Sequence, residues 1–338
     1  MTELNKRQFL GLAAGAAALC TPSILRAAGP TKLRFTNFAG PTSFLTNGIF
    51  RPAFDAIEAA SDGTLKIDIY SGGSLASAAD TYDAVRRGIA DMGWGVTSYT
   101  PGRFKTATLV ELPFEALTSK SASRGLWKLY QEDLLDGFKG VEVFSVMSSG
   151  IQHCHSTKDI DSLDGLAGER VRAAGSTAAM MWEAFGAIPV SLPVSTIAES
   201  LSKNTLRGSM NDWNALETWG ILDFVKWHID VPLGSSPCFL TINKKVFDSL
   251  PEVAQTALRE HGGQRFNDFW GEQLDGENRR LRAVVAEMAD HHILVPTAEQ
   301  LGEWKKRIAP VTEKWVSENP NGERALELYT ATLNEARG

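Results

Sequence analysis

The fold is decided by residues 168–212, which read GERVRAAGSTAAMMWEAFGAIPVSLPVSTIAESLSKNTLRGSMND. Within this stretch RVRAA and AIPVS are typical of strands, and Ser176 is placed to cap a helix that runs to Phe185. STIAESLSK predicts a second, short helix, and LRGSMND a strand-like turn after it. Strands and helices that alternate with short connections indicate an α/β unit with a largely parallel sheet.

The same order of elements occurs earlier in the chain, from Thr31 onward. Alternating apolar residues predict strands at 33–35 and 65–70, with a helix between them that ends near Asp62-Gly63. A further helix over 79–87 leads into the apolar segment ADMGWGV. The two stretches share an architecture but no residue-level repeat. Two such units predict two lobes, with the ligand site at the carboxyl ends of the strands that face each other across a cleft.

Two extended segments, 141–156 and 228–243, carry Gly or Pro midway and are candidates to cross between the lobes. The last hundred residues predict helices over 246–261, 264–289, 298–316 and 323–336. A helix of about 25 residues spans roughly 40 Å, which is enough to brace both lobes. We expect lobe 1 to comprise residues 29–149 plus about 237–277, and lobe 2 residues 150–236 plus about 278–338.

Residues 1–28 have the pattern of a signal peptide. Lys6-Arg7 precedes the uncharged run FLGLAAGAAAL, and small residues follow at Ala27-Ala28. NKRQFL resembles the twin-arginine export motif with Lys6 in place of the first arginine, so the export route stays open between Tat and Sec. After Leu19 there is no run of eighteen apolar residues, so we expect a mature protein that does not span a membrane.

The charge of the mature chain excludes a typical nucleic-acid binder. Without residues 1–28, which hold three basic residues and one acidic residue, 31 basic and 39 acidic residues remain, a net charge of −8. A long-range field of this sign opposes anions, so any anion site has to be built locally.

Three further signals bear on function. In His153-Cys154-His155 only the two histidines share a strand face, whereas structural zinc usually takes four ligands, so a metal site is disfavoured. Cys154 and Cys238 are the cysteines of the mature chain; free thiols are favoured, and a disulfide stays open. The chain has no G-x-S-x-G, H-E-x-x-H or P-loop motif. The alternative function is a secreted hydrolase or metal-dependent enzyme built around His153 and His155.

Four stretches together carry a resemblance to a family. Residues 168–212, with YSGGSL, YDAVRRGIADMGWG and FLTINKKVFDSLPEVAQTAL, are similar to the solute-binding proteins of tripartite ATP-independent periplasmic (TRAP) transporters, and the likeness covers essentially the whole mature chain. The resemblance implies a two-lobed, type II-like periplasmic binding fold with a long hinge-spanning helix. It also implies a periplasmic monomer that is not an enzyme, needs no cofactor, and delivers a small organic acid to membrane permease subunits.

The resemblance assigns the main ligand residue to Arg172. The family has an arginine in a strand that reads G-x-K-(I/V)-R, and it binds the ligand carboxylate; here the matching strand is GERVR. Arg172 is followed by Gly175 and Ser176, where the predicted helix begins. A guanidinium next to a helix N-terminus suits a carboxylate. From the residues alone, a solvated charge at the end of a strand is the alternative.

The other ligand positions also come from the resemblance. The family stretch D-G-x-E-N is Arg207–Asn211 here; Asn211 keeps the ligand-contacting asparagine, and Met210 replaces the acidic residue. Gln152 stands where some relatives have a second arginine, and an amide cannot neutralise a second charge. The remaining expected site residues are Phe38, Gly95, Val194, Trp94 and Trp213, the two tryptophans either as walls or as ordinary core. We therefore expect a monocarboxylate with an apolar or aromatic tail.

Overall fold

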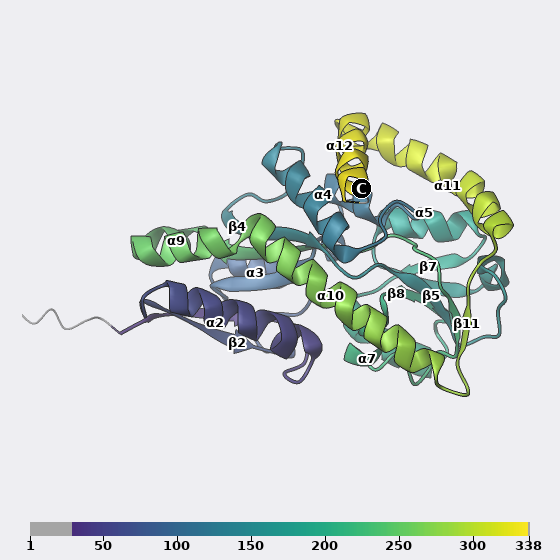
Figure 1. The fold of residues 1–338 in the computed structure, drawn as a ribbon, viewed down its shortest axis with the longest axis horizontal. Helices are drawn as coiled ribbons and strands as arrows, with labels where there is room; N and C mark the ends of the chain where they lie inside the picture. Colours follow the sequence, from purple (N-terminus) through teal and green to yellow (C-terminus); the bar gives the residue numbers. More distant parts are fainter. Residues whose placement is uncertain (1–28, 337–338) are drawn as a thin grey trace, which may run out of the picture. The chain divides into compact units, whose positions relative to one another are not determined.

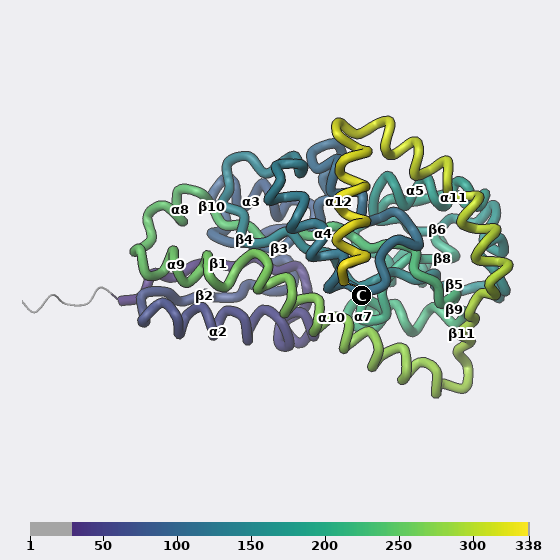
Figure 2. Tube along the Cα trace, turned by 45° about the horizontal axis from the view of Figure 1, so that its top comes forward, coloured from purple at the N-terminus to yellow at the C-terminus, as the bar shows by residue number. Residues whose placement is uncertain are grey.

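The strands of the computed structural model, which describes residues 29–336, form two separate sheets (Figures 1 and 2). The predicted signal peptide, residues 1–28, lies outside the described residues. All elements below belong to the unit that begins at Thr31. None of the helices in this described part of the chain is both long and apolar enough to cross a membrane.

The first sheet has five strands in the order β2-β1-β3-β10-β4. They are β1 (Thr31–Thr36), β2 (Leu65–Tyr70), β3 (Met92–Val96), β4 (Val141–Ser148) and β10 (Pro237–Asn243). β1 is parallel to β2 and to β3, as the alternating pattern of strand and helix predicts. β10 returns from much later in the chain and is antiparallel to both β3 and β4. The sheet is therefore mixed.

The second sheet has six strands in the order β11-β9-β5-β8-β6-β7. They are β5 (His153–Ser156), β6 (Arg170–Ala173), β7 (Ile188–Ser191), β8 (Gly208–Asn211), β9 (Trp227–Ile229) and β11 (His292–Leu294). β6 lies between β7 and β8 and is parallel to both. Arg172 is paired with Val190 on one side and with Ser209 on the other, so neighbouring strands fix its backbone from both sides.

The two segments predicted to cross between the lobes do connect the two sheets. One leads from β4 to β5 and the other from β9 to β10. They run side by side: Ser149 N donates to Ser236 O at 2.9 Å, and Gln152 N donates to Gly234 O at 2.8 Å. The connection between the sheets is therefore a paired, two-stranded ribbon rather than two independent linkers.

Helices flank both sheets (Figure 1). The α-helices are α2 (Arg51–Ala60), α3 (Thr81–Arg87), α4 (Ser119–Gln131), α5 (Ser176–Ala184), α6 (Ile197–Ser202), α7 (Trp213–Thr218), α8 (Lys244–Ser249), α9 (Glu252–His261), α10 (Gly263–Ala286), α11 (Ala298–Glu318) and α12 (Gly322–Glu335). Shorter turns of other helix types are η2 (Leu45–Phe50), η3 (Thr97–Tyr99), η4 (Thr106–Glu111), η5 (Leu163–Leu166) and η6 (Val194–Thr196).

One helix boundary differs from the expectation. The single helix predicted over residues 246–261 is two helices, α8 and α9. Leu250 is extended, with ψ at 150°, because a residue that precedes proline is pushed out of the helical region by the ring of Pro251.

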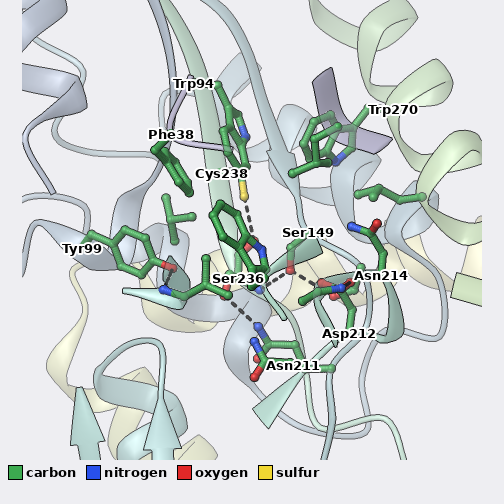
Figure 3. A pocket seen from close by; sticks show the side chains of 18 of the residues that line it. Phe38, Trp94, Tyr99, Ser149, Asn211, Asp212, Asn214, Ser236, Cys238 and Trp270 are labelled. Carbon is green, nitrogen blue, oxygen red and sulfur yellow. Dashed lines mark hydrogen bonds between the residues drawn. The ribbon is translucent and has the colours of Figure 1, made fainter. Parts of the chain in front are cut away.

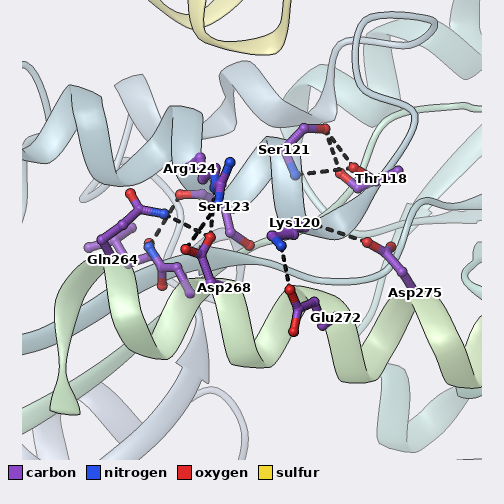
Figure 4. Close-up of polar contacts among 11 residues, drawn as sticks. Thr118, Lys120, Ser121, Ser123, Arg124, Gln264, Asp268, Glu272 and Asp275 are labelled. Atoms are coloured by element: carbon purple, nitrogen blue, oxygen red, sulfur yellow. Dashed lines mark hydrogen bonds and ion pairs between the residues drawn. The ribbon is translucent and has the colours of Figure 1, made fainter. Parts of the chain in front are cut away.

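The long helix α10 packs against α4 and β4 and also against α7 (Figures 1 and 2). Asp275 on α10 accepts from the backbone nitrogens of Ser119 and Lys120 at the start of α4, and Asp268 forms an ion pair with Arg124 (Figure 4). A methyl group at Gly271 would come within 2.6 Å of the Lys120 nitrogen, so the two helices approach each other where α10 has no side chain.

The lobe boundaries expected from the sequence remain a prediction. The C-terminal helix α12 packs against α4, and Tyr329 and Leu333 belong to the same apolar cluster as Leu126 and Leu129. We propose one refinement on this basis: α12 goes with the first sheet, because its buried face is shared with a helix that packs on β4.

Candidate functional site

One cavity is lined by residues from both sheets, from the crossing ribbon and from α10 (Figure 3). Its volume is about 50 Å³. On the side of the first sheet the lining comes from the loop after β1, from β3 and from η3; on the side of the second sheet it comes from β6, η6 and the junction of β8 with α7. The cavity is therefore a site that neither sheet forms alone.

Arg172 lines the cavity and is 1% exposed. Its Nε donates to Leu192 O at 3.1 Å, its Nη1 to Met210 O at 3.0 Å, and its Nη2 to the hydroxyl of Tyr99 at 3.2 Å. A guanidinium has five N–H donors in a fixed fork, so these three bonds leave two, one on each terminal nitrogen. The strand-end arginine is not solvated. It is a buried cation that is held by three hydrogen bonds, and two of its N–H donors take no part in them.

Tyr99 was not among the residues expected from the sequence. Its hydroxyl accepts from Arg172 and, at 2.9 Å, from the backbone nitrogen of Val194. Burial raises the pKa of Tyr99, so the phenol keeps its proton. With both lone pairs used, that proton is left to donate, which adds a third donor beside the guanidinium. The same hydroxyl links η3 of the first sheet with β6 and η6 of the second.

Asn211 and Gln152 also line the cavity. The side-chain oxygen of Asn211 accepts from the Ser209 hydroxyl, and no described group accepts from its amide nitrogen. Gln152 donates from Nε2 to Ser236 Oγ at 2.8 Å, whereas its buried carbonyl oxygen has no hydrogen-bond partner within residues 29–336. Each amide group is thus held at one end, and its other end has no partner among the described residues.

Aromatic rings form a large part of the wall. The ring of Phe38 stacks on that of Trp94 at 4.2 Å between centroids and lies 5.6 Å from that of Trp219, nearly parallel to both. The ring centroid of Trp94 lies 6.0 Å from that of Trp270 on α10. Phe38 and Trp94 come from the first sheet and Trp219 follows α7, so the stack spans the two sides of the cavity. Flat apolar walls of this kind suit an aromatic or other planar solute.

Asp212 is a second residue that the sequence did not single out. It lines the cavity, is 7% exposed, and caps α7 by accepting from Ala215 N at 3.0 Å. Burial raises the pKa of its carboxyl group to about 6. An aspartate before a helix is usually read only as a cap, so nothing in the local sequence distinguishes it as part of a pocket.

The structure places six of the nine expected residues in the lining: Phe38, Trp94, Gln152, Arg172, Val194 and Asn211. The other three lie elsewhere. Gly95 faces the ring of Phe239, and Trp213 packs against the rings of His153, His155 and His228. Strand alternation explains Gly95, because it points to the face of β3 opposite to Trp94.

Gly175, expected to lie at the ligand site, instead lies against the side chain of Glu111. We expected the N-terminus of the helix at Ser176 to help bind the ligand carboxylate, but it holds a carboxylate of the protein. Glu111 accepts from Ala178 N at 3.2 Å and from the Ser98 hydroxyl. A methyl group at Gly175 would come within 2.7 Å of this carboxylate. Burial raises the pKa of Glu111 to about 7.

The histidines of the second sheet form a hydrogen-bonded chain. His155 Nδ1 lies 2.8 Å from His228 Nδ1, and His228 Nε2 lies 3.0 Å from His291 Nδ1. Burial lowers the pKa of all three, that of His228 to about 3, so the rings stay neutral at neutral pH. No three His, Cys, Asp or Glu side chains within residues 29–336 gather as a metal site. This arrangement gives no support to the hydrolase or metal-enzyme alternative.

The two cysteines of the mature chain are free and buried. Cys154 lies on β5 of the second sheet, whereas Cys238 lies on β10 of the first and lines the cavity. Burial raises the pKa of both thiols, which makes them poor nucleophiles.

The chain is similar in sequence and in structure to known proteins. The sequence model of the family described as "Bacterial extracellular solute-binding protein, family 7" matches residues 37–319. The outer membrane transporter protein TsaT of Comamonas testosteroni is 25% identical over 93% of this chain and 96% of that protein. Among solved structures, the chain is similar to a TRAP solute-binding protein from a marine metagenome, described as specific for aromatic acids and bound to 3-hydroxybenzoate (23% identity, TM-score 0.86, 91% of this chain and 99% of that chain). It is also similar to one from Rhodoferax ferrireducens with benzoate (24% identity, TM-score 0.85, 90% and 98%).

Proposed function

The chain belongs to family 7 of the bacterial extracellular solute-binding proteins, and from this we propose that it captures a small monocarboxylate in the periplasm and delivers it to a TRAP transporter. It is a solute-binding protein and not an enzyme. The membrane partners in this proposal are the permease subunits of that transporter.

One observation carries the choice of an acid: a buried guanidinium at the cavity with two unused donors. Among the described residues that line the cavity, Arg172 is the sole Lys or Arg. A carboxylate pairs with a guanidinium through two parallel hydrogen bonds, which is the geometry that two remaining N–H groups allow. The Tyr99 proton and the free amide nitrogen of Asn211 are further donors for the same anion.

The charge of the cavity supports one carboxylate rather than two. Arg172 can neutralise a single negative charge, and the residue at the position of a second arginine is the neutral Gln152. Asp212 adds a carboxylate of its own, so a second carboxylate on the solute would meet a like charge in a buried space. A C4-dicarboxylate therefore fits this site poorly.

The walls support a planar apolar tail. Phe38, Trp94 and Trp219 present stacked faces, and ring stacking contributes roughly 0.5–1.5 kcal/mol beyond the burial of area. The similar marine and Rhodoferax proteins are described with 3-hydroxybenzoate and benzoate, which combine one carboxylate with one ring. We therefore propose an aromatic monocarboxylate as the solute class.

Capture requires the walls to separate. A cavity of about 50 Å³ has room for only a few water molecules, so an aromatic acid enters after Phe38 and Trp219 move apart. When the two sides close again, Tyr99 binds Arg172 and Val194 across the cavity. Contacts of this kind favour the closed arrangement, and a solute shifts the equilibrium by its difference in affinity for the two arrangements.

Thermal unfolding of the mature protein, residues 29–338, tests this function. Benzoate or 3-hydroxybenzoate at about 100 times its Kd should stabilise the protein by about 2.7 kcal/mol and raise Tm by several degrees. Benzyl alcohol, which keeps the ring and lacks the carboxylate, should have no effect, and succinate should have much less. A panel of aromatic and aliphatic monocarboxylates that left Tm unchanged would overturn the proposal.

A further inference from the structure

Gln152 lines the cavity, and its side chain holds a buried acceptor. Gln152 is 3% exposed, and its carbonyl oxygen has no hydrogen-bond partner in the described part of the chain, while its amide nitrogen donates to Ser236 Oγ at 2.8 Å. Buried polar atoms are nearly always hydrogen-bonded, and those that are not call for a specific explanation. Because Gln152 lines the cavity, a donor on the solute is one such explanation.

Asp212 adds a second acceptor. Its capping bond to Ala215 N occupies one oxygen of the carboxylate. Figure 3 shows Asp212 and Tyr99 on opposite sides of the pocket, so this acceptor lies away from the Tyr99 hydroxyl that binds Arg172. The cavity therefore has an acidic acceptor on the side away from the Tyr99 hydroxyl.

We infer that the solute carries a hydroxyl group as well as its carboxylate, and that Gln152 and Asp212 form the side of the cavity that selects this hydroxyl. The inference rests on the proposed function, since it takes the Arg172 end to be the carboxylate end. A hydroxyl has one proton to donate, which matches the single unpartnered carbonyl of Gln152. Its oxygen can in turn accept from the Ser236 hydroxyl, which donates to no described group.

Two related solutes fit this side less well. A keto group offers only acceptors, and these would face the acceptors of Gln152 and Asp212. An unsubstituted acid offers no donor at this side, so it would leave the Gln152 carbonyl unpaired. The side therefore distinguishes a hydroxy acid from its keto and unsubstituted analogues, although all three share one carboxylate.

Calorimetry on matched acids tests the inference. The probes are benzoate with 3-hydroxybenzoate and 4-hydroxybenzoate, phenylacetate with mandelate, benzoylformate and phenylglycine, and propionate with lactate, pyruvate and alanine. In each series that binds, a hydroxy acid should bind roughly tenfold tighter than the unsubstituted or keto analogue, the effect of about one hydrogen bond. Equal affinities within every series, or a preference for a keto or amino acid, would refute the inference while the carboxylate site stood. If no acid in any series bound, the proposed function would fail and this inference with it.

A pair of variants separates selection from folding. Gln152→Met keeps the length of the side chain and removes the acceptor, so the preference for the hydroxy acid over the unsubstituted acid should fall to about twofold or less. Gln131→Met makes the same substitution at an exposed position and should leave both affinities unchanged. Asp212→Asn keeps a helix-capping residue and should also weaken the preference. A tenfold preference that survived in both Gln152→Met and Asp212→Asn would contradict the assignment.

Discussion

Replacing Arg172 by lysine tests the central residue of the site. Lysine keeps the positive charge and loses the planar fork, so it cannot make two parallel bonds to a carboxylate while it also holds three acceptors of the protein. Truncating one partner of a buried, hydrogen-bonded charge pair typically costs about 2–5 kcal/mol of binding free energy. With about 1.4 kcal/mol for each factor of ten, Arg172→Ala should weaken binding of benzoate by roughly 30-fold to several thousand-fold. Arg172→Lys should fall at the low end of that range.

Replacing Arg172 by alanine also destabilises the fold, and the hydrogen bonds that are lost give the size of that effect. Without the guanidinium, Leu192 O and Met210 O lose this donor, whereas the Tyr99 hydroxyl still accepts from Val194 N. A buried group left unpaired costs about 1–3 kcal/mol, so Arg172→Ala should lower the free energy of unfolding by roughly 2 kcal/mol or more. Binding therefore has to be measured by calorimetry at a temperature where urea titration shows the variant to be folded. A folded Arg172→Ala protein that bound benzoate as tightly as the wild type would refute the reasoning.

Three further predictions concern the rest of the site and its support. Tyr99→Phe removes a donor to the carboxylate and should weaken binding by about 10- to 100-fold in calorimetry, with an unchanged Kd as the contrary result. The pKa of Glu111 is raised to about 7 in the folded protein, so ionisation of this carboxyl group destabilises the folded state. As pH rises from about 4.5 to 7, the free energy of unfolding of the wild type should fall by roughly 3 kcal/mol relative to that of Glu111→Gln, with no further fall above pH 7. Urea titrations that gave the same pH dependence of unfolding free energy for both proteins would contradict this. Gly271→Ala should lower the free energy of unfolding by about 1–3 kcal/mol, because the added methyl group meets Lys120. Gly276→Ala, in the same helix but with open space around it, should not lower it. Equal changes in unfolding free energy for the two variants would show that α4 and α10 are not closely packed.

Much of the fold follows from local patterns in the sequence. Strands of the first sheet are evident because apolar residues alternate in the segment Leu65–Tyr70, and the crossing segments because an extended pattern is interrupted by Gly and Pro. The break at Pro251 was also open to prediction, since proline restrains the residue before it. The return of β10 between β3 and β4 was not, because strand neighbours from distant parts of the chain leave no local signal.

The site divides in a similar way. Arg172, Asn211 and Gln152 were expected because the family resemblance aligns them, and the structure places all three in the cavity lining. Tyr99 and Asp212 were missed because their roles depend on which groups the two sheets bring together. Glu111 shows the limit most plainly: it is a carboxylate in an apolar stretch, and its burial against a distant helix start comes only from tertiary packing.

The helix α10 connects the lining of the cavity to parts of the molecule that lie further away. Trp270 and Leu274 touch the cavity, and Asn278, one turn further, accepts from the backbone nitrogen of Asn214 at 2.7 Å. A helix of 24 residues is a rod of about 36 Å whose length does not change when it tilts. A tilt of this rod about the residues at the cavity would therefore displace its two ends more than its middle. Fluorophores near the two tips should register the arrival of a solute that neither of them touches.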